Sequence, residues 1–256
     1  MPDTPSGKGR RSEGAAPLVR GRDAVIIAFV IVFCGAAIKS CGASSPARTS
    51  ETSAAGHTSV VATVQGDDIT VYQTPSGDPW IRMSNPTPVG AERVFLVEGS
   101  NGKGWLKVLL PLRPNGSKGW IDASDVTLEK TTYRVHIYLD RHRFVVKHDE
   151  HDVALEGKIG VGTEKTPTPN GEYFIVSLLK TPGKNSAYGP YAFGLSGFSG
   201  VLKSFAGGPA RIGIHGTNKP ELLGQDVSHG CIRMSNAKIT ELAHMLPLGT
   251  PVYVHS

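Results

Sequence analysis

The chain has few cysteines and no dense block of basic residues, and each absence excludes a class of protein. Only three of its 256 residues are cysteines, at positions 34, 41 and 231. The first two lie in or just after an apolar run, so Cys231 has no partner in the rest of the chain and a structural disulfide is not expected. Although the net charge is +5, Lys and Arg never gather with interleaved aromatic residues. A nucleic-acid partner is therefore not expected.

Glycine and proline, by contrast, are abundant, with 31 Gly and 18 Pro. Both residue types favour turns, so the composition predicts a β-rich protein rather than a helical bundle. Hydrophobic residues make up 39% of the chain, which allows a proper core. The length accommodates a membrane segment and one or two compact domains.

The N-terminal region joins basic residues to an apolar run. Residues 1–23 contain five basic residues, Lys8, Arg10, Arg11, Arg20 and Arg22, and are expected to be a cytoplasmic N-terminus. The following run, AVIIAFVIVFCGAAI, has 15 residues and would span about 22 Å as a helix. Extension to Ala43, with Lys39 reaching the interface, brings it closer to the ~30 Å hydrocarbon core. We therefore expect residues 24–43 to be a single-pass anchor, with the body of the chain on the extracytoplasmic side of the cell membrane.

Two other interpretations of this region stay open. A cleaved secretory signal shares the same basic and apolar pattern. A lipoprotein signal would acylate Cys41, although the charged Lys39 stands where small or apolar residues are usual. All three interpretations export the rest of the chain. Residues 44–57 are rich in Ser, Ala and Thr and are predicted to be a flexible linker.

Residues 58–129 are predicted to form a small β domain. Turn residues separate five candidate strands: Ser59–Val64, Ile69–Gln73, Arg93–Val97, Trp105–Leu110 and Gly119–Ile121. The Gly-Trp pairs that begin the last two strands resemble those of bacterial Src-homology-3-like barrels. We interpret both tryptophans as core residues rather than as a platform for sugars.

Residues 131–256 are predicted to form a second domain. It begins with a half-buried strand, Tyr133–Leu139, and a return strand that starts at Phe144. The other expected elements are a hairpin over Gly160–Phe174, a mobile Gly/Ser/aromatic loop over Tyr188–Leu202, a strand Arg211–Ile214, a helix capped by Asn236 and ended by Gly249, and a last strand Pro251–Val254. Four histidines, at positions 136, 142, 148 and 151, share no ligand spacing, so no metal site is predicted.

The main chemical signal is a pair of short motifs rich in histidine and glycine. His215-Gly216-Thr217 is followed by Ser228-His229-Gly230-Cys231. A thiol, imidazoles and small residues that let a carbonyl approach the backbone are what cysteine-dependent acyl transfer requires. The sequence therefore predicts covalent chemistry on an acyl group.

These motifs resemble the signature of the YkuD-type L,D-transpeptidase catalytic domain. The Thr-Pro-Thr-Pro-Asn-Gly segment and the strand that starts at Tyr133 support the resemblance. It implies a mainly β protein, in which the small barrel is followed by a β-sandwich-like catalytic domain with one or two short helices and no cofactor. It also implies peptidoglycan remodelling. Such enzymes attack the third residue of a donor stem tetrapeptide, release D-alanine, and pass the acyl group to a neighbouring stem as a 3→3 cross-link.

The resemblance also implies roles for individual residues. Cys231 would be the nucleophile and His215 the proton donor and acceptor, held through its other ring nitrogen by a carbonyl near Gly216. A neighbouring imidazolium would lower the pKa of the thiol. His229 is assigned to site shape and the oxyanion, and the backbone N–H groups of Gly230 and Cys231 to the oxyanion hole.

Five residues are expected to bind substrate or support the site: Gly216, Thr217, Ser228, Arg233 and Tyr191. Arg233 is the candidate for a stem carboxylate. The spacer between the two motifs is shorter than in many members of the family, and Arg233 stands where some carry asparagine. Neither departure removes a catalytic group.

The sequence leaves the acyl acceptor open. Transfer to water would make an L,D-carboxypeptidase, and transfer to a protein amine would anchor that protein to the wall. An inactive wall-binding module is the alternative from another class, but both Cys231 and His215 are present. Sequence alone also does not decide which of His215 and His229 is the base.

Overall fold

The structure, a computed structural model, describes residues 58–149, 152–183, 185–205 and 207–256. These residues are mainly β, as the composition predicts. The predicted N-terminus, anchor and linker lie outside the described residues. None of the helices in the described part of the chain has the length and apolar character needed to cross a membrane.

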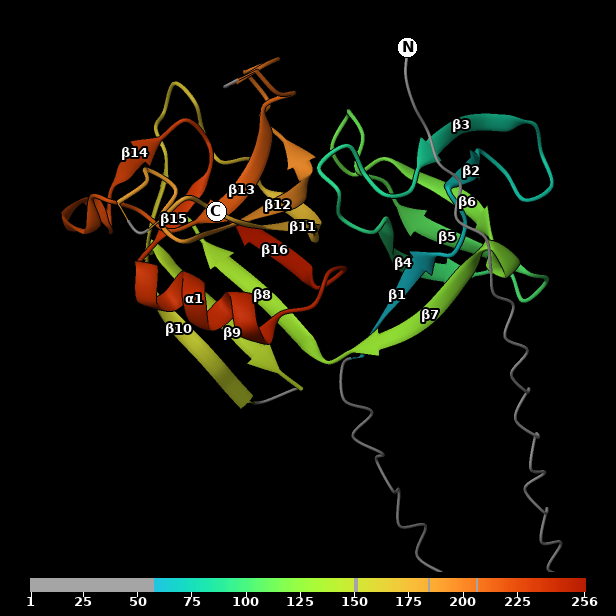
Figure 1. Ribbon diagram of the computed structural model, residues 1–256, viewed down its shortest axis with the longest axis horizontal. Coiled ribbons are helices and arrows are strands. Elements are labelled where there is room, and N and C mark those ends of the chain that lie inside the picture. Colours follow the sequence, from blue (N-terminus) through green and yellow to red (C-terminus); the bar gives the residue numbers. More distant parts are fainter. Residues whose placement is uncertain (1–57, 150–151, 184, 206) are drawn as a thin grey trace, which may run out of the picture. The chain divides into compact units, whose positions relative to one another are not determined.

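The first sheet has seven antiparallel strands in the order β3-β2-β6-β5-β4-β1-β7 (Figure 1). The strands are β1 (Ser59–Val64), β2 (Asp68–Tyr72), β3 (Pro79–Ser84), β4 (Val94–Ser100), β5 (Trp105–Leu109), β6 (Lys118–Asp122) and β7 (Val126–Thr131), with a short 3-10 turn at Ala123–Asp125 before the last. Alternating side chains, such as Ile69 and Val71, point into a core enclosed by this sheet. The resemblance of this domain to Src-homology-3-like barrels stays a prediction.

Two strands of the first sheet were missing from the sequence prediction. Strand β3 begins with a proline, which is tolerated at the first position of an edge strand. Strand β7 is exposed at four of its six positions, so it shows no apolar alternation. The interpretation of both tryptophans as core residues is also wrong. Trp105 and Trp120 are only partly buried, and Trp105 packs edge-on against Tyr72 with ring centroids 5.0 Å apart.

The second domain contains nine strands in the order β14-β10-β15-β13-β12-β11-β16-β8-β9, and β9 also pairs with β10. The strands are β8 (Tyr133–Tyr138), β9 (Arg143–His148), β10 (Asp152–Gly162), β11 (Gly171–Lys180), β12 (Tyr191–Phe198), β13 (Arg211–His215), β14 (Asp226–Ser228), β15 (Ile232–Met234) and β16 (Pro251–His255), with a short 3-10 turn at Pro220–Leu222. The β9–β10 pairing closes the sheet on itself.

Two long strands connect the two faces of this closed sheet. Strand β10 pairs with β9 as far as Lys158 and with β15 from Ile159 onward. In the same way, β11 pairs with β16 as far as Phe174 and with β12 from Ile175 onward. The result is two layers around one apolar core, as the sandwich-like prediction implied.

The hairpin predicted over Gly160–Phe174 is wrong. Strands β10 and β11 do not pair with each other, because each pairs with other strands on both of its sides. The connection between them folds instead against the turn that carries Cys231, through Thr168. Its Gly and Pro residues shape that connection rather than a two-stranded ribbon.

The predicted mobile loop over Tyr188–Leu202 is wrong in its central part, which is strand β12. Its glycines sit where neighbours approach too closely for a side chain. A Cβ at Gly197 would overlap the ring of Tyr173, and one at Gly194 would lie 2.6 Å from Ser177 Oγ. The composition is therefore typical of a loop, but the cause is tight packing in a sheet.

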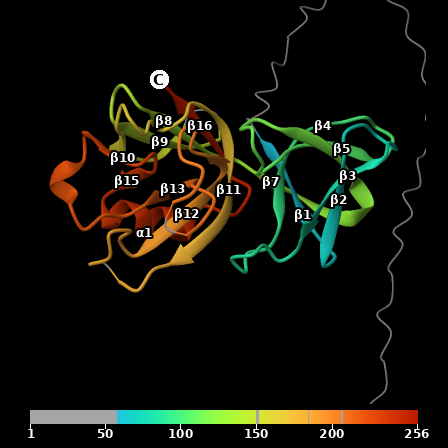
Figure 2. The same ribbon diagram turned by 90° about the horizontal axis from the view of Figure 1, so that it is seen from above.

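Helix α1 (Asn236–Met245) packs against β12 and β13 and buries Ile239 and Leu242 (Figure 2). Its N-cap is Ser235, whose hydroxyl accepts a hydrogen bond from the backbone N–H of Lys238. The prediction that Asn236 caps this helix is wrong by one residue. The amide oxygen of Asn236 instead accepts a hydrogen bond from the backbone N–H of Thr217, next to the first motif.

Candidate active site

The register of two neighbouring parallel strands brings the two motifs together. Strands β13 and β15 pair Ile214 with Ile232 and His215 with Arg233. Because side chains alternate along a strand, one side of this pair faces the core, with Ile212, Ile214, Ile232 and Met234 all buried. Gly213, His215 and Arg233 face the other way, and Cys231 stands on the same side just before β15. Strands about 4.8 Å apart and two residues of offset put His215 and Cys231 roughly 8 Å apart at the backbone.

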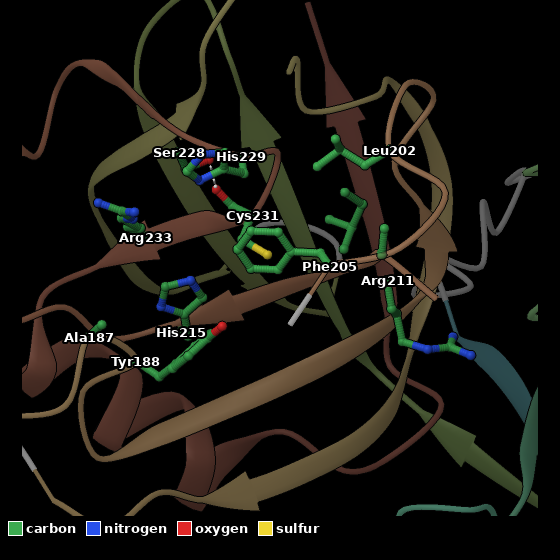
Figure 3. A pocket seen from close by; sticks show the side chains of 12 residues that line it. Ala187, Tyr188, Leu202, Phe205, Arg211, His215, Ser228, His229, Cys231 and Arg233 are labelled. Atoms are coloured by element: carbon green, nitrogen blue, oxygen red, sulfur yellow. Dashed lines mark hydrogen bonds between the residues drawn. The ribbon is translucent and has the colours of Figure 1, made fainter. Parts of the chain in front are cut away.

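A cavity of about 240 Å³ opens over this side of the strands. Figure 3 shows Cys231 at its centre, with His215 and Arg233 on one side and Ser228 and His229 on another. The predicted nucleophile and both predicted histidines therefore share one space.

His215 is buried, with 5% of its surface exposed. Its Nδ1 lies 2.6 Å from the backbone oxygen of Gly216, as the resemblance implied. A carbonyl can only accept, so Nδ1 carries the proton and Nε2 is the free, basic nitrogen. Burial lowers the pKa of His215 to about 4; the Gly216 carbonyl opposes this shift, and the positive charge of Arg233 adds to it. The imidazole is therefore neutral at pH 7.

Burial also raises the pKa of the Cys231 thiol, although the backbone N–H of Gly213 and the charge of Arg233 partly oppose that shift. The expectation that a neighbouring imidazolium lowers this pKa is wrong, because His215 is not protonated near neutral pH. The resting pair is a neutral thiol and a neutral imidazole. If this thiol acts as a nucleophile, it must lose its proton during the attack rather than before it.

The turn before Cys231 is fixed by Ser228. Its hydroxyl donates to the backbone oxygen of Cys231 at 2.6 Å and accepts from the N–H of Gly230 at 3.0 Å. Gly230 has φ +111°, a conformation that suits glycine. Because the Gly230 N–H is already donated to Ser228, the structure does not support Gly230 as a backbone donor of an oxyanion hole. The N–H of Cys231 and the ring of His229 are the candidates that remain.

A second buried hydroxyl, missed by the sequence analysis, holds the same turn from the other side. Thr168, in the connection between β10 and β11, accepts from the N–H of Gly162 at 2.9 Å and donates to the backbone oxygen of Gly230 at 3.0 Å. The Thr-Pro-Thr-Pro-Asn-Gly segment stands out in the sequence, but its pattern does not indicate that Thr168 forms a hydrogen bond with the backbone of Gly230.

Two of the predicted substrate-binding residues lie away from the cavity. Thr217 is buried, and its hydroxyl accepts from the N–H of Lys219, so it shapes the chain after His215. The ring of Tyr191 packs near His244, with centroids 6.0 Å apart, and against the core. Gly216 acts through its carbonyl on His215, and a Cβ there would collide with Asn236. None of the three lines the cavity.

Arg233 does line the cavity, as predicted. Its Nε is buried and has no hydrogen-bond partner among the described residues. His229 also lines it, on the exposed side, with its ring 5.3 Å from that of Phe205 between centroids. Burial and a fixed tautomer therefore distinguish His215 from His229 and favour His215 as the base.

Aromatic side chains that cover the cavity were missed by the sequence analysis. Tyr188 lies over His215, with ring centroids 4.8 Å apart, and Phe205 lies beside Cys231 in Figure 3. Tyr188 stands in a Tyr-Gly-Pro-Tyr segment whose composition suggests a lid, but the sequence analysis assigned substrate binding to the other tyrosine of this segment, Tyr191. Phe205 has no local pattern that could have identified it.

Fold and site together define a class: a closed β-sheet domain in which a partly exposed cysteine shares a cavity with a buried, oriented histidine. Residues 132–254 match the family model YkuD, the L,D-transpeptidase catalytic domain.

Relatives of known sequence agree with this match. The chain is 39% identical over 97 residues to "Putative L,D-transpeptidase YkuD" of Bacillus subtilis, a match that covers 38% of this chain and 51% of that protein. It is 36% identical over 108 residues to "Putative L,D-transpeptidase YqjB" of the same organism, covering 40% of this chain and 61% of that protein. The chain spans about half the length of the first of these relatives. Family model and relatives therefore agree that residues 132–254 are similar to the YkuD-type L,D-transpeptidase catalytic domain.

Solved structures with some likeness include a mutant Enterococcus faecium L,D-transpeptidase, at 26% identity and TM-score 0.37, covering 48% of this chain and 50% of that one. L,D-transpeptidase 3 from Mycobacterium tuberculosis has 16% identity and TM-score 0.41, covering 65% of this chain and 92% of that one.

Proposed function

We propose that the chain is an exported peptidoglycan L,D-transpeptidase that forms 3→3 cross-links through an acyl-enzyme on Cys231. The observation that carries this proposal is the buried His215, whose Nδ1 is fixed by the Gly216 carbonyl and whose free Nε2 shares a cavity with Cys231. The family model over residues 132–254 supports the proposed substrate class.

In the first half-reaction, the sulfur of Cys231 attacks the carbonyl of the third residue of a donor tetrapeptide. His215 takes the thiol proton at Nε2 as the C–S bond forms, because the resting thiol is neutral. The imidazolium then returns the proton to the leaving amine. The products are a thioester on Cys231 and free D-alanine.

The tetrahedral oxyanion needs donors on the side of the cavity opposite His215. The backbone N–H of Cys231 and the ring of His229 are proposed for this role. Arg233, with its unpartnered Nε among the described residues, is proposed to hold a carboxylate of the donor.

In the second half-reaction, an amine attacks the thioester carbon. His215, again neutral, removes the proton from the attacking amine, and the thiolate leaves and is reprotonated. Water in place of the amine gives an L,D-carboxypeptidase, and a protein amine gives anchoring of that protein. These remain the alternatives, since all three use the same acyl-enzyme.

The proposed location is the extracytoplasmic side of the cell membrane, with residues 24–43 as a single-pass anchor and 44–57 as the linker. Its support is the basic and apolar pattern of the N-terminal sequence. Localisation of a C-terminal reporter fusion tests it, and a cytoplasmic body would contradict it.

The test of the activity mixes the full chain with a disaccharide-tetrapeptide and records masses of intact protein and products. The expected result is an adduct that lacks one D-alanine, together with cross-linked dimer. Cys231→Ala should give no adduct, whereas Cys41→Ala, a matched control, should still give it. An adduct with only tripeptide product would favour the carboxypeptidase. No adduct with any donor would contradict the proposal.

A further inference from the structure

Cys231 borders a second cavity, of about 450 Å³, besides the one already described. Cys231, His215 and Arg211 are among the residues that line both cavities, whereas Ser228, His229 and Arg233 line only the first and Gly213 lines only the second. The two spaces therefore meet around Cys231, and each has wall residues that the other lacks.

The wall of the second cavity includes residues of the first domain. Thr87, Pro88, Val89, Arg93 and Pro111 come from the seven-stranded sheet and its loops, and the remaining lining residues come from the second domain. Both domains belong to one compact unit of the chain. A ligand in this cavity would touch both.

The second cavity has an uncompensated positive charge. The charged side chains in its wall are Arg93 and Arg211, and the wall contains no Asp or Glu. Neither arginine forms an ion pair within the described residues. Arg93 is 7% exposed and Arg211 is half-buried; Arg211 lines both cavities, and in Figure 3 its guanidinium end extends away from Cys231. A buried and a half-buried guanidinium group without a carboxylate are unfavourable unless an anion joins them.

Protein contacts leave part of each guanidinium available. Arg93 donates through Nε to the backbone oxygen of Ser84 at 2.6 Å. Arg211 donates through one terminal nitrogen to the backbone oxygen of Leu195 at 2.7 Å, and its guanidinium lies 4.6 Å from the centre of the Phe198 ring. These contacts fix both planar groups and supply no negative charge.

Two further observations agree with an anion site. Burial and the charge of Arg93 together lower the pKa of Arg211 to about 10, which means that the two guanidinium groups act on each other. The hydroxyl of Thr87, in the same wall, is buried and has no hydrogen-bond partner among the described residues. A carboxylate between the arginines would neutralise the repulsion, and a peptide in this cavity could satisfy the hydroxyl.

We propose that the second cavity binds the acyl acceptor, an amine-bearing peptide, and that Arg93 and Arg211 hold its carboxylate. This inference rests on the proposed function. With the donor acyl group attached to Cys231 and Arg233 holding the donor in the first cavity, the second cavity is the free route to the thioester. Arg93 thus makes the first domain part of the acceptor site.

The transfer step moves the acyl group from the Cys231 sulfur to the acceptor nitrogen. The acceptor amine, neutral when it attacks, uses its lone pair to form a C–N bond to the thioester carbon. The C–S bond breaks, and its electron pair stays on the Cys231 sulfur. The extra proton on nitrogen passes to His215 Nε2 and from there to the thiolate. An amide and the free thiol remain.

The experiment uses two matched acceptors, a stem tripeptide ending in a diamino acid with its carboxylates free, and the same peptide fully amidated. Acyl-enzyme is formed first on the full chain, and transfer rates are compared at equal concentrations of unprotonated amine. The free acid should react about tenfold faster or more, as a charge-assisted bidentate contact allows. Arg93→Gln and Arg211→Gln should each bring the ratio close to one.

Arg82→Gln is the matched control, since Arg82 is an exposed arginine of the first domain outside both cavities. It should retain the wild-type preference for the acid. Equal rates for acid and amide in the unsubstituted chain would overturn the proposal. The proposal would also be overturned if Arg93→Gln and Arg211→Gln slowed acylation by the donor as much as they slow transfer. The two arginines would then hold a carboxylate of the donor rather than of the acceptor.

A binding measurement separates this proposal from the proposed function. In Cys231→Ala, which does no chemistry, the arginine Nε–H signals are assigned by their loss in Arg93→Gln and Arg211→Gln. Titration with the acceptor peptide whose carboxylates are free should shift both signals. The fully amidated peptide should shift neither. If no donor acylates the chain, the proposed function fails, and these shifts alone then decide whether the anion site exists. Absence of shifts with the acid overturns the proposal.

Discussion

A neutral thiol beside a neutral imidazole sets the pH range in which Cys231 can be activated. The general base must be unprotonated, and the pKa of His215 is lowered to about 4, mainly by burial. We expect the acylation rate to hold as the pH falls through 6.5, where a free imidazole would protonate, and to decline only below about pH 5. Single-turnover acylation, with a donor whose carboxylates are blocked, measures this profile. A midpoint near 6.5 would contradict the neutral pair.

The same burial makes folding stability depend on pH. His215 and His136 both have a folded pKa of about 4, against about 6.5 for a free imidazole, so the unfolded chain binds protons first on acidification. Their stabilising contribution is present above pH 6.5 and is lost as the pH falls toward 4. The urea midpoint should therefore be lower at pH 5 than at pH 7.

His136→Phe provides the control for this linkage. The phenyl ring can keep the stacking on Tyr253 and His255 but does not titrate. The difference between the midpoints at pH 7 and pH 5 should shrink in this variant. An unchanged difference would mean that His136 does not contribute to it.

Gly213 tests how tightly the backbone surrounds the sulfur. A Cβ at this position would lie 2.8 Å from the backbone oxygen of Phe193 and 4.0 Å from the Cys231 sulfur, and a carbonyl in a strand cannot move aside easily. We expect Gly213→Ala to slow acylation by about tenfold or more and to lower stability by about 1–3 kcal/mol. Gly200→Ala is the matched control, because no atom lies within 4 Å of a Cβ there. Similar effects of the two substitutions, by acylation rate and urea unfolding, would refute the steric argument.

At the scale of elements, the connection between β10 and β11 holds the turn that carries Cys231, the proposed nucleophile. Thr168 bridges the N–H of Gly162 and the carbonyl of Gly230. Thr168→Val keeps the shape but removes both hydrogen bonds, leaving two buried backbone groups unpaired at a cost of about 2 kcal/mol or more. Acylation should slow markedly, and Thr168→Ser, which keeps the hydroxyl, should recover most of the rate. Failure of serine to recover it would assign the effect to packing.

Elements with a complete local pattern could be predicted from the sequence. Strand β1 has the predicted bounds, and β13 begins at the predicted Arg211 and runs one residue beyond the predicted end, to His215, because apolar alternation and turn residues marked both. The glycines of β12 suggested a loop, since their cause is the nearness of Tyr173 and Ser177, which no local pattern reveals. The β10–β11 connection was predicted as a hairpin for the same reason, because some of the strands that pair with β10 and β11 lie far from them in the sequence.

In the candidate site too, some features could be predicted from the sequence and others could not. His215, Cys231 and the Gly216 carbonyl lie within short motifs, so their grouping and the histidine tautomer could be anticipated. The neutral state of the pair could not, because it depends on burial by the whole sheet. Tyr188 was missed in favour of Tyr191, since sequence does not tell which of two nearby tyrosines faces the cavity.

At the scale of the whole described molecule, the first domain holds a segment that covers the active site. Arg113, between β5 and β6, donates to the backbone oxygens of Ser199, Leu202 and Pro209 at 2.6, 2.9 and 3.1 Å. Asn115 makes two hydrogen bonds with the backbone of Phe198, at 2.8 and 2.9 Å. The chain that follows β12 and carries Leu202 and Phe205 to the cavity is therefore tied to the first domain.

Arg113→Met keeps much of the apolar side chain over Phe198 but removes the three hydrogen bonds that hold this segment. Amide exchange around Ser199 and Leu202 should become about tenfold faster or more, and acylation should slow, because the wall of the cavity is no longer fixed. Exchange mass spectrometry and single-turnover acylation measure the two effects, with Arg82→Met as an exposed control. Faster exchange with an unchanged acylation rate would show that the cavity wall need not be held. Unchanged exchange would mean that the second domain orders this segment alone, and that the first domain contributes to catalysis only through Arg93.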